Sequence, residues 1–262
     1  MSKTNSVSSQ SDNKQNKPFI KMKNILIFSM LTSFLLSGCI SVYDKTKVKG
    51  SGTVTIEQRA VTSFDRIIVN GAFTVYLSQG DTESVEVEID DNLQKYVEVR
   101  NEGHRLVLGI KDHVNFVKTT QNNVYITLKN IESFEVSGVC KVKTSGSLDC
   151  DHLAIKVSGV ANGECELYCN KLNVNLSGVA NFELRGETTE LNVNQSGVGK
   201  FDAMNLTAAK ATVVNSGVGS VSVYATQELS MTNSGVGSIT YSGDAEIKTL
   251  HSSGIGKIKK AK

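Results

Sequence analysis

Apolar and polar residues alternate in short runs from about residue 52 onward, and after residue 134 the runs recur at a regular interval. Alternation with a period of two is typical of β-strands that bury one face. Ser-Gly followed by Val or Ile marks each interval, with successive gaps of 21, 19, 19, 20, 18 and 19 residues. The serines of these tripeptides are Ser137, Ser158, Ser177, Ser196, Ser216, Ser234 and Ser253. Apolar residues flank most of them at fixed offsets on both sides, which predicts two strands per repeat.

A repeat of about twenty residues that contains only strand-like runs is typical of stacked coils, each burying its apolar face against its neighbours. The sequence therefore predicts an all-β fold, with a parallel β-helix (β-solenoid) of about seven rungs over residues 134–262. Seven rungs at about 4.8 Å would make a rod about 34 Å long. The glycine after each serine, and the small residue three positions after it, predict tight corners. Residues 52–133 alternate less regularly and are expected to form an irregular β-rich section that caps the rod.

Equivalent positions of consecutive repeats are expected to lie in columns, and one outward column is acidic. Glu164, Glu183 and Asp202 each stand six residues after their serine. Stacked carboxylates of this kind are a candidate Ca²⁺ site, although nothing here supplies the six or more oxygen ligands that Ca²⁺ prefers. An ordinary solvated face is the alternative interpretation, and no cofactor is expected.

Four cysteines lie in the repeat region: Cys140, Cys150, Cys165 and Cys169. Cys150 and Cys169 both stand eight residues before a repeat serine, so they should stack on adjacent rungs at a Cα spacing that a disulfide tolerates. Burial as small hydrophobic residues and a metal or redox role are the alternatives. No histidine accompanies the cysteines at metal-ligand spacing, so a zinc site is weakly supported.

Two further features of the repeats have a structural explanation. Gln195, Asn215 and Asn233 directly precede their serines and are expected to hydrogen-bond with one another as a stacked ladder. The last repeat carries four lysines, which would repel the pairing of an open strand edge with another chain. These are Lys257, Lys259, Lys260 and Lys262. A lipid or nucleic-acid patch is the alternative interpretation of the lysines.

The first forty residues have the pattern of an export signal. Lys21 and Lys23 precede an apolar run over residues 25–36, which is too short to span a bilayer. The residues Leu-Ser-Gly-Cys that follow resemble the bacterial lipobox, which implies cleavage before Cys39 and lipidation of that residue. We therefore expect a signal peptide over residues 1–38, with Met22 as an alternative start, and a lipidated tether over residues 39–51. An unmodified Cys39 after a conventional signal is the alternative.

Charge and motifs argue against two classes of function. The segment 1–38 holds five lysines and one aspartate, a net of +4, so removing it changes the total from +2 to −2. A mature chain of this charge gives no general electrostatic reason to bind nucleic acid. The sequence also lacks a nucleophile elbow, a phosphate-binding loop and a His-rich metal motif. Asp149 and Asp151 could form an acid/base pair, but alternation places both on the outer face, so a non-enzymatic protein is expected.

The segment from Phe64 to Phe73, together with the later Ser-Gly-Val-Gly corners, resembles a bacterial envelope family, the putative auto-transporter adhesins with a head GIN domain. The resemblance covers about residues 52–258 and implies a secreted, often lipid-anchored β-solenoid. It brings no catalytic or binding residues. It favours surface binding, adhesion or envelope structure, with an unknown protein or glycan partner and a membrane contact through the lipid anchor. A polysaccharide-acting β-helix enzyme and a periplasmic partner in signalling or envelope maintenance are the alternatives. Ile40, which follows Cys39, favours the outer membrane.

Overall fold

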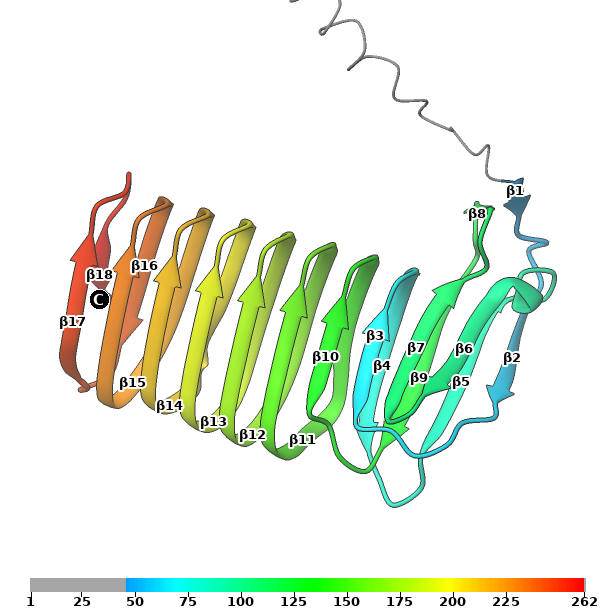
Figure 1. Cartoon of the computed structure of the whole chain (residues 1–262), viewed down its shortest axis with the longest axis horizontal. Helices are drawn as coiled ribbons and strands as arrows, with labels where there is room; N and C mark the ends of the chain where they lie inside the picture. The colour runs from blue at the N-terminus through cyan, green and yellow to red at the C-terminus, as the bar shows by residue number, and fades with distance from the viewer. Residues whose placement is uncertain (1–45, 262) are drawn as a thin grey trace, which may run out of the picture. The chain divides into compact units, whose positions relative to one another are not determined.

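The structure, a computed structural model, describes residues 46–261, which form one compact unit built almost entirely of β-strands (Figure 1). Its first part contains β1 (Thr46–Lys49), β2 (Val54–Arg59), β3 (Arg66–Val69), β4 (Ala72–Gln79), β5 (Ser84–Asp90), the short 3₁₀ helix η1 (Gln94–Tyr96), β6 (Val97–Glu102), β7 (Arg105–Ile110), β8 (Val114–Val117) and β9 (Asn122–Leu128). Its second part contains β10 (Ser133–Val136), β11 (Val139–Val157), β12 (Val160–Leu176), β13 (Val179–Gln195), β14 (Val198–Asn215), β15 (Val218–Asn233), β16 (Val236–Ser242), β17 (Glu246–Ser252) and β18 (Ile258–Lys260). Residues 46–261 contain no α-helix.

The second part is the predicted parallel solenoid. Strands β11 to β15 are 16 to 19 residues long, and each bends around one coil and pairs in parallel with the next. The coils stack side by side from β10 to β17 (Figure 1). Equivalent repeat positions therefore meet in register, as Phe182 and Phe201 do. The fold class and the number of rungs predicted from the sequence are confirmed.

The parallel stack begins earlier than the repeat, inside the section expected to be an irregular cap. Strand β3 pairs in parallel with β10 on one side and β7 on the other, and β4 pairs in the same way with β11 and β9. The chain thus builds coil β3–β4 first, adds β5 to β9 on one side of it, and returns to the other side with β10. Asn70-Gly71-Ala72 forms an additional corner in this coil, since Val139 N donates to Gly71 O at 2.9 Å. Part of the segment predicted as a tether, residues 39–51, forms a strand, because Thr46–Lys49 pairs with β8.

The N-terminal end of the stack is closed by antiparallel strands. Strand β2 pairs with β5, and β6 pairs with β7, both antiparallel. The buried side chain of Gln94 ties this end together, because its Nε2 donates to Thr55 O at 2.9 Å and to Val87 O at 3.0 Å, while Arg59 donates to its Oε1 at 2.7 Å. These contacts leave the core beneath, including Leu93, shielded from solvent.

Each Ser-Gly corner rests directly on the backbone of the preceding corner. A Cβ atom on Gly197 would lie 2.0 Å from Gly178 O, and one on Gly178 would lie 2.0 Å from Gly159 O. Any side chain would overlap the carbonyl oxygen below it, so the close approach of successive coils requires glycine here. Ser196 N and Gly197 N both donate to Leu176 O at 2.9 Å, which fixes the corner to the coil beneath.

The corners are of two kinds, and a buried amide accompanies three of the four glycine corners. Cys140, Ala161 and Ala180 stand third after the serine in the first three repeats, whereas glycines with φ between +141° and +152° stand there in the last four. Residues that carry a Cβ atom rarely adopt a φ in this range. In this conformation Gly199 O accepts a hydrogen bond from Gln195 Nε2, and Gly237 O accepts one from Asn233 Nδ2, both at 3.0 Å. Each amide that precedes a serine thus accompanies a glycine three residues after that serine.

The expected amide ladder forms only in part. Asn215 Nδ2 donates to Asn233 Oδ1 at 3.0 Å, as predicted, but Gln195 bonds a corner carbonyl and not the next amide. The side chain of Gln195 bonds a carbonyl of its own corner, as that of Asn233 also does. The column therefore satisfies buried backbone carbonyls, whereas Gln195 Oε1 and Asn215 Oδ1 accept no hydrogen bond among the described residues.

Candidate functional site

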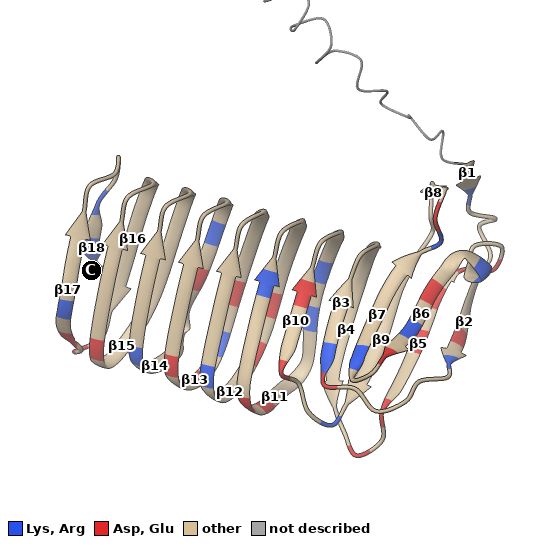
Figure 2. Ribbon diagram, viewed as in Figure 1, with Lys and Arg blue, Asp and Glu red and all other residues tan. Residues whose placement is uncertain are grey.

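The row of Ser-Gly-Val corners forms an uncharged edge along the whole repeat region (Figure 2). The third residue of each corner lies outward, with an exposed fraction between 41% and 76%. We call this column the valine ridge; it consists of Val139, Val160, Val179, Val198, Val218, Val236 and Ile255. Its members pair in register from coil to coil. Six intervals of about 4.8 Å make the ridge about 29 Å long.

Small polar side chains accompany the valine ridge. The corner serines lie on one side, and a shallow groove of about 690 Å³ follows the corners between Ser177 and Ile255. Two residues after each ridge position, a second column contains Lys141, Asn162, Asn181, Lys200, Ser220, Ser238 and Lys257. Asn181 Nδ2 in this column donates to Asn162 Oδ1 at 3.2 Å. An apolar strip bordered by hydroxyl groups, amide groups and three lysines is suited to contact with another surface.

The acidic column predicted from the sequence is present, with Glu164, Glu183 and Asp202 in register. Lysines contact both of its ends: Lys143 Nζ lies 2.6 Å from Glu164 Oε2, and Lys200 Nζ lies 2.8 Å from Asp202 Oδ2. The hydrogen bond from Lys143 lowers the pKa of Glu164. Across residues 46–261, no group of three or more His, Cys, Asp or Glu side chains is arranged to hold a metal ion. The Ca²⁺ site stays a prediction.

Cys150 and Cys169 lie opposite each other on adjacent coils, as predicted, and both thiols are free. A hydrogen bond joins the two sulfur atoms; it raises the pKa of Cys150 and lowers the pKa of Cys169 to about 7. Cys169 Sγ also lies 3.6 Å from Thr188 Oγ1. Cys140 and Cys165 are buried, and burial raises the pKa of each to about 12. The pair on the adjacent coils is therefore the reactive one.

We expect mild oxidation with diamide to join Cys150 to Cys169 and to leave the other two thiols free. The two thiols lie opposite each other on adjacent coils, so the thiolate of either one can attack the diamide adduct of the other. Closing a loop of this size should raise the free energy of unfolding by about 3 kcal/mol. Thiol counting in denaturant, with and without reductant, measures the change, which is a loss of two of the four thiols in residues 46–261. Cys140→Ser with Cys165→Ser is the matched control and should oxidise like the parent, whereas four free thiols after oxidation would contradict the bridge.

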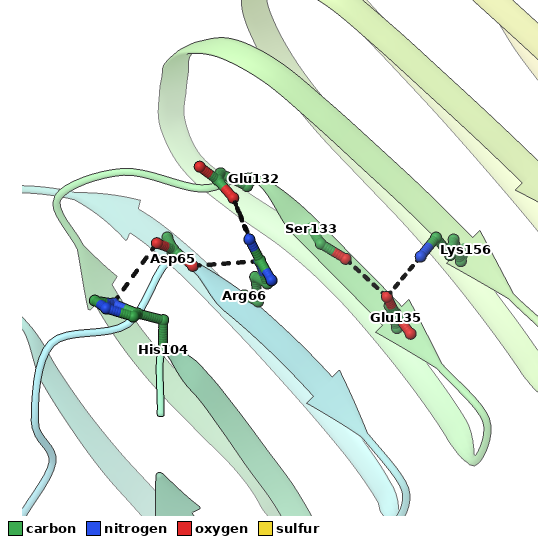
Figure 3. A network of polar contacts seen from close by, with 7 residues as sticks. All are labelled: Asp65, Arg66, His104, Glu132, Ser133, Glu135 and Lys156. Atoms are coloured by element: carbon green, nitrogen blue, oxygen red, sulfur yellow. Dashed lines mark hydrogen bonds and ion pairs between the residues drawn. The ribbon is translucent and has the colours of Figure 1, made fainter. Parts of the chain in front are cut away.

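A network of charged side chains lies where the chain returns from β9 to β10 (Figure 3). Arg66 Nη2 lies 2.9 Å from Glu132 Oε2 and its Nε lies 3.6 Å from Asp65 Oδ1, while His104 Nδ1 lies 3.7 Å from Asp65 Oδ2. Asp65, His104 and Glu132 border a cavity of about 360 Å³ that Cys150 also lines. Because most of their charges are paired with one another, the network favours a role in holding the inserted strands to the first coil.

Sequence reasoning missed this network. Asp65, His104 and Glu132 are distant along the chain because β5 to β9 separate, in the sequence, two coils that are neighbours in space. The Asp-Arg pair at 65 and 66 was the available signal, within the segment that carries the family resemblance. Beside it, Lys156 Nζ lies 2.8 Å from Glu135 Oε1, and this hydrogen bond lowers the pKa of Glu135.

Asp149 and Asp151, the candidate acid/base pair, are both exposed, as alternation predicted. Asp151 accepts a hydrogen bond from Asn170 Nδ2 at 2.6 Å and contacts His152 Nδ1 at 2.8 Å. The bond from Asn170 lowers the pKa of Asp151. Its carboxylate is thus held in the ionised form at the surface, like many solvated side chains.

Residues 63–245 match the family model described as "Putative auto-transporter adhesin, head GIN domain". The chain belongs to this family. The family's description names an adhesin, which indicates a protein of the cell envelope or cell surface and favours a non-enzymatic role. Within residues 46–261, no helix is both long and apolar enough to cross a membrane.

Solved structures share the fold with this head GIN protein. A putative adhesin from Bacteroides fragilis NCTC 9343 is 28% identical, with a TM-score of 0.79 over 82% of this chain and 100% of that one. A putative adhesin from Parabacteroides merdae ATCC 43184 is 21% identical, with a TM-score of 0.60 over 82% of this chain and 99% of that one. A structure named putative lipid binding protein, from Parabacteroides distasonis ATCC 8503, is 23% identical, with a TM-score of 0.59 over 83% and 100% of the two chains. No curated protein matches this chain.

Three predictions fall outside the described residues. These are the signal peptide over residues 1–38, the lipidation of Cys39 and the first part of the tether over residues 39–51. They stay predictions from the sequence.

Proposed function

We propose that this head GIN protein is a non-enzymatic, lipid-anchored protein of the outer membrane that acts by binding another surface along the valine ridge. The exposed, uncharged ridge is the observation that supports the proposal most directly. It presents a branched apolar side chain seven times in register, as six valines and one isoleucine, and soluble proteins seldom expose so continuous an apolar strip without a binding role. Lipidation of Cys39 would hold the solenoid at the membrane.

The repetition suits a ligand that is itself extended. Each coil adds one valine, one serine and one small polar or lysine side chain at about 4.8 Å intervals, so the ridge would gain contacts in proportion to the length engaged. A glycan chain or an extended protein surface would offer such a partner. Hydroxyl and amide groups beside the apolar strip would hydrogen-bond the polar groups of either one.

We expect replacement of three ridge valines by threonine to weaken adhesion about tenfold or more without unfolding the protein. Val179→Thr, Val198→Thr and Val218→Thr keep the branched shape that strands favour and remove only the apolar character. Adhesion of cells that carry the protein to glycan-coated and protein-coated surfaces is the measurement. Cys39→Ser should abolish adhesion by releasing the protein from the cells.

Ile56→Thr with Val214→Thr is the matched control, because both residues are exposed apolar side chains away from the ridge. This control should adhere like the parent protein. Equal adhesion of the ridge variant and the control would overturn the proposal, as would slow depolymerisation of the bound glycan, which would indicate an enzyme.

A further inference from the structure

The two ends of the described solenoid differ in how they are closed. At the N-terminal end, antiparallel strands and η1 cover the core. At the other end, β17 pairs only with β15 and β18 pairs only with β16, so within residues 46–261 their outer edges have no partner strand (Figure 1). All seven residues of β17 are exposed. This end is called the C-terminal edge here and comprises residues 246–260.

Core columns that are covered in the inner coils are uncovered at the C-terminal edge. Ile247 continues the column of Leu229, whose exposed fraction is 1%, but is itself 40% exposed. Leu250 likewise follows Met231, which is fully buried, and is 53% exposed. In every inner coil, the next coil supplies the missing cover. One added strand would therefore bury both side chains, at a gain of about 25 cal/mol for each Å² of apolar surface.

The backbone of this edge offers the same acceptors that every inner corner uses. In each coil, the serine and glycine N–H groups donate to the residue before the preceding serine, and the next residue donates to the preceding glycine. In the last step of this series, Ser253 N donates to Asn233 O at 3.0 Å, and Ile255 N donates to Gly235 O at 2.9 Å. By the same rule, Ser252 O and Gly254 O are the next acceptors, and they specify a parallel strand.

The charge of the C-terminal edge selects among partners. Lys257, Lys259 and Lys260 are exposed, and none of them has an ion pair within the described residues, whereas Lys248 Nζ lies 2.6 Å from Glu246 Oε2. Two identical edges would bring these three lysines together and repel each other. An acidic strand would be attracted instead.

We propose that the C-terminal edge, β17 and β18, accepts an extended acidic segment of another protein as an added parallel strand. The strand donates its N–H groups to Ser252 O and Gly254 O, covers Ile247 and Leu250 with alternate apolar side chains, and places carboxylates near the lysines. A membrane is the poorer partner, because hydrocarbon cannot satisfy the unpaired backbone groups of an open strand. The site shares Ile255 with the valine ridge, but it does not depend on the function proposed for the ridge.

A synthetic eight-residue peptide that alternates valine and glutamate tests the proposal, with fluorescence anisotropy of the labelled peptide as the measurement. We expect saturable binding to the full chain that weakens as salt rises. The same peptide with lysine in place of glutamate should not bind. A third peptide, with two valines replaced by proline, should bind at least about fivefold more weakly because it lacks two N–H donors.

Variants of the protein locate the site. Charge reversal by Lys257→Glu, Lys259→Glu and Lys260→Glu should weaken binding about tenfold or more, and Leu250→Thr about threefold, with the fold checked by circular dichroism. The matched control reverses Lys47, Lys49 and Lys111, which are exposed lysines near the other end, and should bind like the parent. Equal binding of the acidic and basic peptides would overturn the proposal. So would a loss of binding in the control alone, or cosedimentation with phosphatidylglycerol vesicles in the absence of peptide binding.

Discussion

Gly197→Ala is expected to prevent the solenoid from reaching its native packing. The added Cβ would lie 2.0 Å from Gly178 O, and the atoms in conflict all belong to the backbone, so no side chain can rotate away. Relief requires the two coils to separate, which would stretch the hydrogen bonds that Ser196 N and Gly197 N make to Leu176 O. The free energy of unfolding should fall by on the order of 4 kcal/mol, a loss large enough to unfold many domains. Chemical denaturation followed by circular dichroism measures it.

Gly109→Ala is the matched control for this prediction. Gly109 lies in β7, and a Cβ there would have its nearest neighbour, Glu98 Oε2, at an ordinary distance of 3.9 Å. This variant should be as stable as the parent, or slightly more stable, because alanine loses less backbone entropy on folding. If Gly197→Ala were also neutral, the close stacking of the corners would be wrong, and the valine ridge would lose the regular spacing on which its proposed function rests.

The repeat region was predictable because one chemical requirement recurs at every coil. Each corner needs a glycine where the preceding carbonyl approaches, and each strand needs inward apolar residues, so the pattern repeats in the sequence wherever it repeats in space. Phe182 and Phe201 show how far this goes, since their common offset from a serine was enough to place them in register. Gly163, in the same column, is the exception that the fold explains: the ring of Phe182 fills the place of its side chain, with Cε1 2.2 Å from the position of a Cβ.

The N-terminal coils escaped prediction because their contacts are distant along the chain. Asn70-Gly71 takes the place of a Ser-Gly corner, and Ser137 Oγ of the next corner donates to Asn70 Oδ1 at 2.7 Å. In the sequence, however, the inserted residues 80–132 lie between these two corners. A search for a fixed period cannot detect such an insertion. The candidate site also has a predictable and an unpredictable part. The columns of acids and thiols follow from the repeat period. The exposure of the valine ridge does not, because it depends on the direction in which each corner turns.

Asp90→Ala is expected to loosen the N-terminal end. The carboxylate of Asp90 has no exposed surface and accepts hydrogen bonds from Gly52 N at 2.7 Å, Thr120 N at 2.8 Å and Thr120 Oγ1 at 2.9 Å. It thereby joins β5 to the segments before β2 and β9. Its loss would leave three donors without an acceptor, and the free energy of unfolding should fall by about 3 kcal/mol or more. Thermal unfolding at neutral pH measures this loss.

The same carboxylate predicts a pH dependence. Burial raises the pKa of Asp90, but the hydrogen bonds from Thr120 and Gly52 outweigh it, so the folded pKa lies below the usual value of 3.8. A lowered folded pKa contributes stability above the unfolded pKa, and that stability is lost as the pH falls through the folded pKa. The melting temperature of the parent should therefore fall more steeply below pH 3.8 than that of Asp90→Asn, which cannot titrate at this position.

Asp81→Asn is the matched control, because Asp81 is exposed in the turn between β4 and β5. It should unfold like the parent at neutral pH and keep the parent's steeper loss in acid. Parallel acid profiles for Asp90→Asn and the parent would show that the buried carboxylate does not carry the pH dependence. Closure of the N-terminal end would then have to rest on Gln94 and the strand pairing alone. If the profiles diverge as expected, a single buried charge joins the segments that cover this end, while nothing comparable covers β17 and β18 among the described residues.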